Sequence, residues 1–218
     1  MSATWAVVPV KAFERGKSRL ALVLDAAARA ALARTLFERV AGALAACEGL
    51  AGVLIATDSH EVAAVARAKG FEPLLDAAGM PGGEGALGRI VDRALGHVAE
   101  RGATSALVVM SDLPLVETRD LEHLIRLVAS HDMVIVPDAD REGTNALALA
   151  RPTLLRTGFG RYGSFAVHCE EAQRAGLHAL ILENQRFGLD IDAPADLEMC
   201  GFGVHGGGAP LPKAPACQ

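Results

Sequence analysis

The sequence has few residues that could hold a structural zinc ion or a disulfide framework. Its four cysteines, Cys47, Cys169, Cys200 and Cys217, show no CxxC or CxxxC spacing. The seven histidines include no HxxxH pair. We therefore expect reduced thiols, which are typical of cytoplasmic proteins, and no sulfur-ligated metal.

Two further classes of protein are disfavoured by what is missing. No run of 18 apolar residues occurs, so no membrane-spanning helix is expected, and the first apolar run is too short for a signal peptide. We expect a cytoplasmic protein. Lysine and arginine number 21 against 26 acidic residues, and this net charge of -5 disfavours binding to a nucleic-acid backbone. A local basic cluster could still bind a small anionic substrate.

Continuous apolar runs alternate with helical patterns along the 218 residues. Strands are predicted at residues 5–10, 52–57, 105–110, 132–136, 145–150, 178–182 and 187–191. Helices are predicted at residues 25–47, 60–69, 86–101, 117–130 and 165–175, with a short one from Pro194. This order predicts an α/β fold, a three-layer Rossmann-like sandwich whose mostly parallel sheet carries helices on both faces. Residues 1–200 are expected to form one domain, and the Gly/Pro-rich residues 201–218 a disordered tail.

Ligands of open α/β sheets bind beyond the carboxyl ends of the strands, so the residues that follow each strand matter most. Basic residues and a glycine follow the first strand and its Pro9, in the order Lys11, Arg15, Gly16, Lys17, Ser18 and Arg19. Fixed cations and free backbone N–H groups are what a triphosphate needs. Neither GxxxxGK[ST] nor GxGxxG is present, and a solvated basic loop is the alternative.

Acidic residues follow three other predicted strands. Asp112 follows the third strand, and Asp190 and Asp192 stand two apart on an extended segment, which turns both carboxylates the same way. Mg²⁺ prefers such hard oxygen ligands, so these three residues are candidate metal ligands, although Asp112 could instead cap a helix. For Asp58, after the second strand, helix capping is the favoured interpretation.

Two polar loops are candidates for a second, anionic substrate. The first ends in Thr144 and Asn145, and a plain turn is its alternative. The second runs from Phe159 to Phe165, where Gly160, Gly163 and Ser164 precede a helix whose N-terminus can bind an anion. Ser164 could equally be an ordinary N-cap. His168, one turn into that helix, is expected to be structural or hydrogen-bonding, because transfer to an ionised phosphate needs no general base.

Taken together, these segments resemble the 2-phospho-L-lactate guanylyltransferase family of coenzyme F420 biosynthesis, over about residues 5–197. The order and spacing of the shared motifs carry the resemblance: VPVK at 8–11 with KSRL at 17–20, SDLP at 111–114, GTN at 143–145, GSF at 163–165 with His168, and DID at 190–192 with Asp196 and Leu197. The family usually has a glycine where Glu142 stands, and the loop at 159–164 is one residue longer here.

The resemblance implies a nucleotidyltransferase fold of the glycosyltransferase-A type, with GTP as donor and Mg²⁺ as cofactor. It implies a three-carbon phospho acid as acceptor, namely phosphoenolpyruvate, 3-phospho-D-glycerate or 2-phospho-L-lactate. Asp112, Asp190 and Asp192 match the family's metal-binding acids, and Thr144, Ser164 and either Gly160 or Gly163 match its acceptor-binding residues. We expect Lys17 and Arg19, helped by Lys11, to hold the phosphates of GTP.

Three points stay open at this stage. A related nucleotidyltransferase acting on a molybdopterin or sugar phosphate is the second hypothesis, although the Gly-rich, Arg-containing signature of those families is absent after the first strand. A non-catalytic nucleotide-binding protein is the third. The Ala and Leu residues of the first helix either form a homodimer contact or pack inward.

Overall fold

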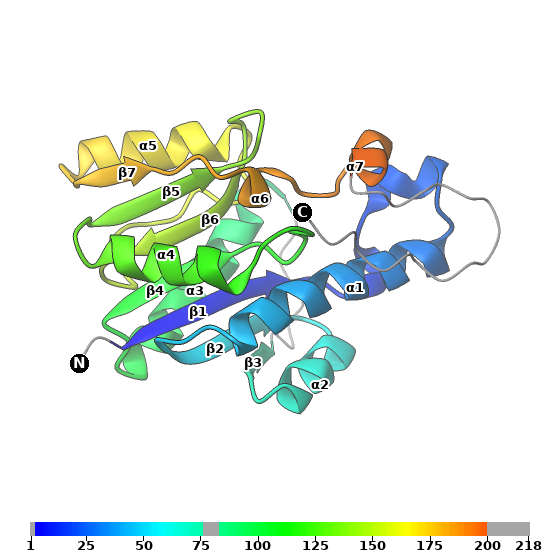
Figure 1. Ribbon diagram of the computed structural model, residues 1–218, viewed down its shortest axis with the longest axis horizontal. Helices are drawn as coiled ribbons and strands as arrows, with labels where there is room; N and C mark the ends of the chain where they lie inside the picture. The colour runs from blue at the N-terminus through cyan, green and yellow to red at the C-terminus, as the bar shows by residue number, and fades with distance from the viewer. Residues whose placement is uncertain (1–2, 76–82, 200–218) are drawn as a thin grey trace.

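The computed structural model describes residues 3–75 and 83–199, and it places seven strands in one twisted sheet (Figure 1). The strand order is β3-β2-β1-β4-β6-β5-β7. The strands are β1 (Thr4–Val10), β2 (Leu50–Thr57), β3 (Glu72–Leu75), β4 (Ser105–Val109), β5 (Met133–Pro137), β6 (Thr144–Leu149) and β7 (Ala179–Ile181). All neighbouring pairs are parallel except those of β6, which runs antiparallel to β4 and β5. The prediction of a mostly parallel sheet is confirmed.

Helices cover both faces of the sheet, as the alternation of patterns predicted. They are α1 (Ala26–Ala45), α2 (His60–Ala68), α3 (Ala86–Glu100), α4 (Thr118–Val128), α5 (Ser164–Arg174), α6 (Gln185–Gly188) and α7 (Pro194–Met199), with 3-10 turns η1 (Phe13–Arg15) and η2 (Ser18–Leu22). α1, α2, α4 and α6 pack on one face, and α1 and α4 lie in front of the sheet in Figure 1. α3 and α5 pack on the other face.

The pleat of β1 divides its side chains between the two apolar layers. Ala6, Val8 and Val10 face α1 and α4, whereas Val7 faces α3. Both layers are fully buried, which is why these strands read as unbroken apolar runs in the sequence. The leucines of α1 are part of the first layer or of a smaller cluster beside it, so they pack inward.

That smaller cluster joins segments that are far apart in the sequence. Leu20 of η2, Leu32 and Leu36 of α1, Ile191, and Leu197 of α7 are buried together. Figure 1 shows the result, with α7 lying beside the η turns and the first turns of α1. The basic loop after β1 and the Asp190–Asp192 segment are thereby held at the same end of the sheet.

The structure corrects two of the predicted elements. The strand predicted at residues 187–191 is wrong: the side chain of Asn184 accepts a hydrogen bond from the Arg186 N–H and starts the short helix α6, after which the chain continues without pairing. β3, which the sequence did not predict, is a four-residue strand containing Pro73 at the edge of the described sheet, where it pairs with β2.

Two helix starts also differ from expectation. Ser59, not Asp58, caps α2 by accepting from the Val62 N–H. Gly163 occupies the N-cap position of α5 in a left-handed conformation, so Ser164 is the first helical residue and not the cap. Asp25, the first residue of the helix predicted at 25–47, is the N-cap of α1, and its side chain accepts from the Ala28 N–H. The predicted tail at 201–218 lies outside the described residues.

Candidate active site

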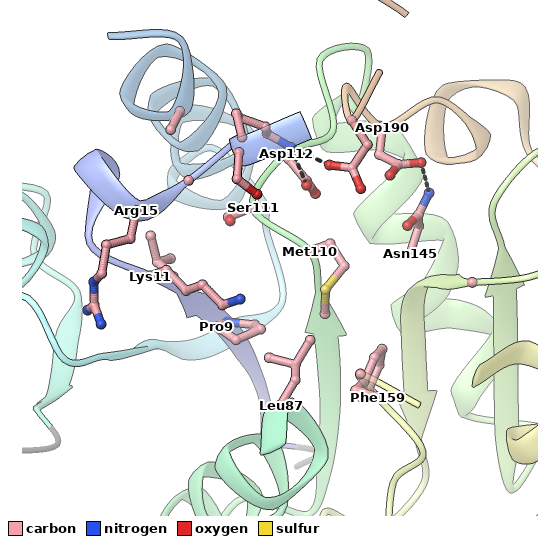
Figure 2. A pocket seen from close by; sticks show the side chains of 18 of the residues that line it. Pro9, Lys11, Arg15, Leu87, Met110, Ser111, Asp112, Asn145, Phe159 and Asp190 are labelled. Atoms are coloured by element: carbon pink, nitrogen blue, oxygen red, sulfur yellow. Dashed lines mark hydrogen bonds and ion pairs between the residues drawn. The ribbon is translucent and has the colours of Figure 1, made fainter. Parts of the chain in front are cut away.

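A cavity of about 500 Å³ opens at the edge of the sheet where β1 and β4 end (Figure 2). Because β6 runs opposite to its neighbours, its first residues, Thr144 and Asn145, lie at this same edge. Nearly all the residues singled out in the sequence line the cavity: Pro9, Lys11, Lys17, Ser18, Arg19, Asp112, Thr144, Asn145, Gly160, Ser164, Asp190 and Asp192. Gly163 is the exception and caps α5 outside the lining. Of the two candidate glycines, Gly160 is therefore the one in the cavity wall.

Three carboxylates meet at one end of the cavity. One oxygen each from Asp112, Asp190 and Asp192 lies within 4.8 Å of the other two. Figure 2 shows Asp112 and Asp190 at the same end of the cavity, away from Leu87 and Pro9, with Asp190 beside Asn145. Asp112 does not cap α4, because Glu117 occupies that position. Three hard oxygen donors in mutual reach fit a divalent cation such as Mg²⁺.

Burial and mutual repulsion act on this acidic cluster. Burial, followed by the neighbouring charges of Asp112 and Asp192, raises the pKa of Asp190 to about 6. A hydrogen bond from the Asn145 amide, at 3.2 Å, works in the opposite direction. The cluster thus holds more negative charge than its surroundings neutralise, which favours uptake of a cation.

Lys17 is the cation nearest to the acids. Its ammonium donates to Asp112 at 2.6 Å and to Asp192 at 3.0 Å, and its side chain is only 6 % exposed. Burial alone would lower the pKa of Lys17, but attraction to the two carboxylates outweighs burial and raises it. The backbone of Lys17 is left-handed, with φ 55°, an uncommon conformation for a residue with a side chain. The turn before η2 therefore directs this lysine into the site.

The other basic residues of the loop are more open. Arg19 lies 3.6 Å from Asp192 with a side chain that is 79 % exposed. Arg15 pairs with the buried carboxylate of Asp58, which raises the pKa of Arg15. Lys11 extends into the open part of the cavity in Figure 2. The exposure of these basic side chains therefore increases from the buried Lys17 to the largely exposed Arg19.

The opposite wall carries hydroxyl groups. Thr144 and Ser164 are both nearly buried, and their oxygens lie 3.5 Å apart. Asn145 differs from them, because its amide donates to the Phe187 carbonyl at 2.8 Å and to Asp190. Its contacts position a carboxylate, whereas Thr144 and Ser164 supply the hydroxyl groups of this wall.

The loop between β5 and β6 tolerates the glutamate that departs from the family pattern. Asp138 accepts hydrogen bonds from the N–H groups of Glu142 and Gly143. The left-handed position of this turn is Arg141, with φ 58°, so Glu142 needs no glycine conformation. A Cβ at Gly143 would lie 2.6 Å from the Asp138 carboxylate, so the second glycine of the motif is the one that packing requires.

Sequence reasoning did not assign roles to two groups of residues at this site. Asp196 accepts from the N–H groups of Asp192, at 2.9 Å, and Ala193, at 2.6 Å, and so shapes the acidic segment. An acid just after Pro194, at the start of a short helix, is the local signal for it. Leu87, Met110 and Phe159 line the apolar part of the cavity, and they come from segments that only the folded chain brings together.

Comparison with known proteins agrees with this geometry. A phosphoenolpyruvate guanylyltransferase from Conexibacter woesei is 38 % identical over 197 residues, covering 89 % of this chain and 86 % of the relative. One from Rubrobacter xylanophilus is 37 % identical, covering 88 % and 91 %. A 2-phospho-L-lactate guanylyltransferase from Methanothermobacter thermautotrophicus is 30 % identical, covering 93 % and 87 %.

Solved structures support the fold. A protein from Desulfovibrio desulfuricans G20, described as a nucleotide-diphospho-sugar transferase, superposes with a TM-score of 0.72 at 21 % identity, covering 91 % of this chain and 86 % of that one. A 4-diphosphocytidyl-2C-methyl-D-erythritol synthase superposes with a TM-score of 0.61 at 16 % identity, covering 91 % and 97 %. The model of the family "Guanylyl transferase CofC like" matches residues 4–210. This chain is therefore a nucleotidyltransferase that belongs to the CofC-like guanylyltransferase family.

Proposed function

We propose that the protein transfers GMP from GTP to a three-carbon phospho acid, with release of diphosphate, as a step of coenzyme F420 biosynthesis. The observation that carries this proposal is the meeting of three carboxylates and the buried Lys17 at one end of a cavity whose other wall carries hydroxyl donors. Donor phosphates need the first group of residues, and an anionic acceptor needs the second.

Asp112, Asp190 and Asp192 are the residues that would hold Mg²⁺. When bound there, the ion supplies charge neutralisation for the phosphate oxygens of the nucleotide. Lys17 and Arg19 would contribute fixed positive charge to the β and γ phosphates, with Lys11, Ser18 and the backbone after Pro9 lining the same path. Lys17 already lies against the acids, so a short movement of its side chain suffices to exchange a carboxylate for a phosphate oxygen.

The acceptor would bind at Thr144, Ser164 and Gly160. The phosphate and carboxylate groups of such an acid are mainly hydrogen-bond acceptors at neutral pH, so a wall of hydroxyl donors suits them. Relatives at 37–38 % identity are named phosphoenolpyruvate guanylyltransferases, which makes phosphoenolpyruvate our first choice of acceptor. 3-Phospho-D-glycerate and 2-phospho-L-lactate are the next candidates, since they share its phosphate and carboxylate.

In the proposed reaction, a phosphate oxygen of the acceptor attacks the α-phosphorus of GTP. The bond from that phosphorus to the oxygen bridging to the β-phosphate breaks, and diphosphate leaves with the electron pair. The attacking oxygen is already ionised, so no side chain has to remove a proton. The contribution of the chain is positioning and electrostatic stabilisation.

The test is a diphosphate-release assay with purified protein, GTP and Mg²⁺, offering the three acids singly and then in competition, with products read by mass spectrometry. We expect a guanylylated product from at least one acid. Turnover only with a molybdopterin or sugar phosphate would support the second hypothesis. Binding of GTP in calorimetry without any turnover would support a non-catalytic protein.

Two broader statements belong to the same proposal. GTP is a cytoplasmic metabolite, so we place the reaction in the cytoplasm. In the described residues, no helix has both the length and the apolar content needed to cross a bilayer. A homodimer stays a proposal that sedimentation would test.

A further inference from the structure

His168 is completely buried on α5, directly behind the hydroxyl wall of the cavity. Its Nδ1 lies 2.9 Å from Thr144 Oγ1, and its Nε2 accepts from the Gly158 N–H at 2.8 Å. The ring also meets Phe159, a residue of the cavity wall, edge to face at 4.8 Å between centroids. Each nitrogen of the imidazole therefore has a defined protein partner.

The backbone fixes the tautomer of this imidazole. A backbone N–H can only donate, so Nε2 facing Gly158 must present its lone pair, and the single proton of the neutral ring sits on Nδ1. In a charged ring Nε2 would also carry a proton, so two donors, Nε2–H and the backbone N–H of Gly158, would face each other without an acceptor. Burial also disfavours the charged ring; it outweighs a hydrogen bond with the Ser164 backbone, which acts in the opposite direction, and the pKa of His168 is lowered to about 4. The ring is thus a neutral donor through Nδ1.

This tautomer decides what the Thr144 hydroxyl can do. Nδ1–H donates to Thr144 Oγ1, and Ser164 Oγ approaches the same oxygen at 3.5 Å. With its oxygen engaged as an acceptor on the protein side, the hydroxyl proton of Thr144 is left to point into the cavity that Thr144 lines. An anionic acceptor requires a donor at that place.

We propose that His168 is a positioning residue for the acceptor: its imidazole, held in the Nδ1–H tautomer by the Gly158 amide, orients the Thr144 hydroxyl as a donor to the bound anion. The inference rests on the proposed function, because it concerns how the acceptor is held. His168 touches neither substrate nor the acids, and it acts through Thr144.

Two near-isosteric variants separate the two hydrogen bonds of the ring. The amide nitrogen of asparagine overlies Nδ1, so His168→Asn can keep the donor toward Thr144 and loses the acceptor for Gly158. The amide oxygen of glutamine overlies Nε2, so His168→Gln keeps the acceptor for Gly158 and loses the donor. We expect His168→Gln to raise the acceptor KM about tenfold, the cost of one charge-assisted hydrogen bond, with the GTP KM within about twofold. His168→Asn should restore most of the acceptor KM.

A double-mutant comparison with Thr144→Val shows whether the effect passes through the hydroxyl. Once the hydroxyl is gone, His168→Gln should add less than about twofold to the acceptor KM. A full tenfold effect in the Thr144→Val background would overturn the inference. The inference would also be overturned if His168→Gln and His168→Asn raised the acceptor KM equally and in proportion to their losses in melting temperature, because a merely structural role predicts that result.

Nitrogen-15 NMR of the histidine rings tests the tautomer in the unmodified protein, whether or not the variants fold. We expect a protonated Nδ1 and an unprotonated Nε2 for His168 near neutral pH, and the reverse tautomer or a charged ring would overturn the inference. Absence of turnover by the wild type with all three acids would defeat the proposed function and this inference together. Wild-type turnover combined with an unchanged His168→Gln would defeat this inference alone.

Discussion

Replacement of Arg186 by methionine should be among the most destabilising single changes outside the apolar core. Asp120 on α4 is 3 % exposed and accepts from Arg186 Nε at 2.7 Å and from Nη2 at 2.5 Å. It also accepts from Asn184 at 3.1 Å, and Asn184 caps α6. The pair therefore fixes α6 against α4, and the segment that leaves α6 carries Asp190 toward the cavity.

The magnitude follows from leaving a buried carboxylate without its cation. Breaking a buried pair by removing one partner costs about 3–5 kcal/mol of unfolding free energy. Arg186 is itself 35 % exposed, and Asp120 keeps the neutral donors Asn184 and Glu117 N–H, so we expect about 2–3 kcal/mol, near the lower end. Methionine keeps most of the apolar stem of the arginine, so the loss is mainly electrostatic.

The cost should depend on pH in a defined direction. Burial acts to raise the pKa of Asp120, but hydrogen bonds from Arg186, Glu117 N–H and Asn184 outweigh it and hold the pKa below its ordinary 3.8. In the wild type this stabilisation is therefore present above pH 3.8 and is lost as the pH falls through the lower folded-state value. In the variant, burial without the cation should raise the pKa of Asp120, a penalty that is relieved as the pH falls. Both effects make the difference largest near pH 7 and smaller near pH 3.

The assay is urea unfolding of wild type and Arg186→Met at pH 7, 5 and 3. Arg174→Met is the matched control, because the partners of Arg174 among the described residues are the exposed Glu170 and Glu171, and the change should cost about 0–1 kcal/mol. A loss for Arg186→Met no larger than that of the control at pH 7 would refute the reasoning. A loss that is the same at pH 7 and pH 3 would refute the assignment to Asp120.

Three further predictions concern the cavity. Asp112→Ala should reduce diphosphate release at least about a hundredfold while the melting temperature changes little. Glu170→Gln, a control at an exposed residue, should leave the rate of diphosphate release unchanged. Substantial residual activity of Asp112→Ala would contradict a role for Asp112 at the metal. In the absence of nucleotide, the Lys17→Met variant should bind Mn²⁺ about tenfold more tightly than the wild type, because the three acids lose a competing cation. The same variant should have a higher KM for GTP. Weaker Mn²⁺ binding in calorimetry would count against competition between Lys17 and the metal ion. Gly160→Ala should lower the free energy of unfolding by about 1–3 kcal/mol and raise the acceptor KM. The reason is that φ of Gly160 is 72° and that an added Cβ would lie 2.8 Å from Leu87 Cβ. An unchanged melting temperature would show that the loop relaxes.

The part of the fold that could be predicted is the part decided by local pattern. β1, β2, β4 and β5 are apolar runs between helical segments, and such runs are typical of strands in a sheet that is buried on both faces. β3 could not be found in this way, because four half-buried residues with a proline become a strand only through pairing with β2. The error at residues 187–191 has the same origin, since a capped four-residue helix and a short apolar strand look alike in sequence.

The site was more predictable than its details. The rule that ligands bind beyond strand ends predicts from the sequence alone that Asp112 and the Lys17 loop share one edge of the sheet, and the Asp190–Asp192 segment reaches the same edge without the strand that was predicted for it. The rule could not show that Asn145 holds Asp190, that Asp196 shapes the acidic segment, or that His168 lies behind Thr144. Those contacts depend on side-chain distances, which sequence spacing does not determine. The choice between Gly160 and Gly163 likewise needed the cavity lining.

Bringing three carboxylates together at one end of the cavity is electrostatically unfavourable, and the burial of apolar side chains from the same segments offsets this unfavourable free energy. Three carboxylates within 4.8 Å repel one another, and the raised pKa of Asp190 is a measure of that repulsion and of its burial. Lys17 neutralises one charge, which leaves the cluster short of cations. Directly beneath it, Leu20 follows Lys17 by three residues and Ile191 separates the two acids, and both are fully buried in one apolar cluster with Leu197. Apolar burial contributes about 25 cal/mol for each Å². Burial of these side chains can therefore keep segments from opposite ends of the chain together, in a geometry that the repulsion between the carboxylates opposes. The deficit of cations then belongs to the folded geometry of the site, and it is the property on which the proposed uptake of a metal ion with its nucleotide depends.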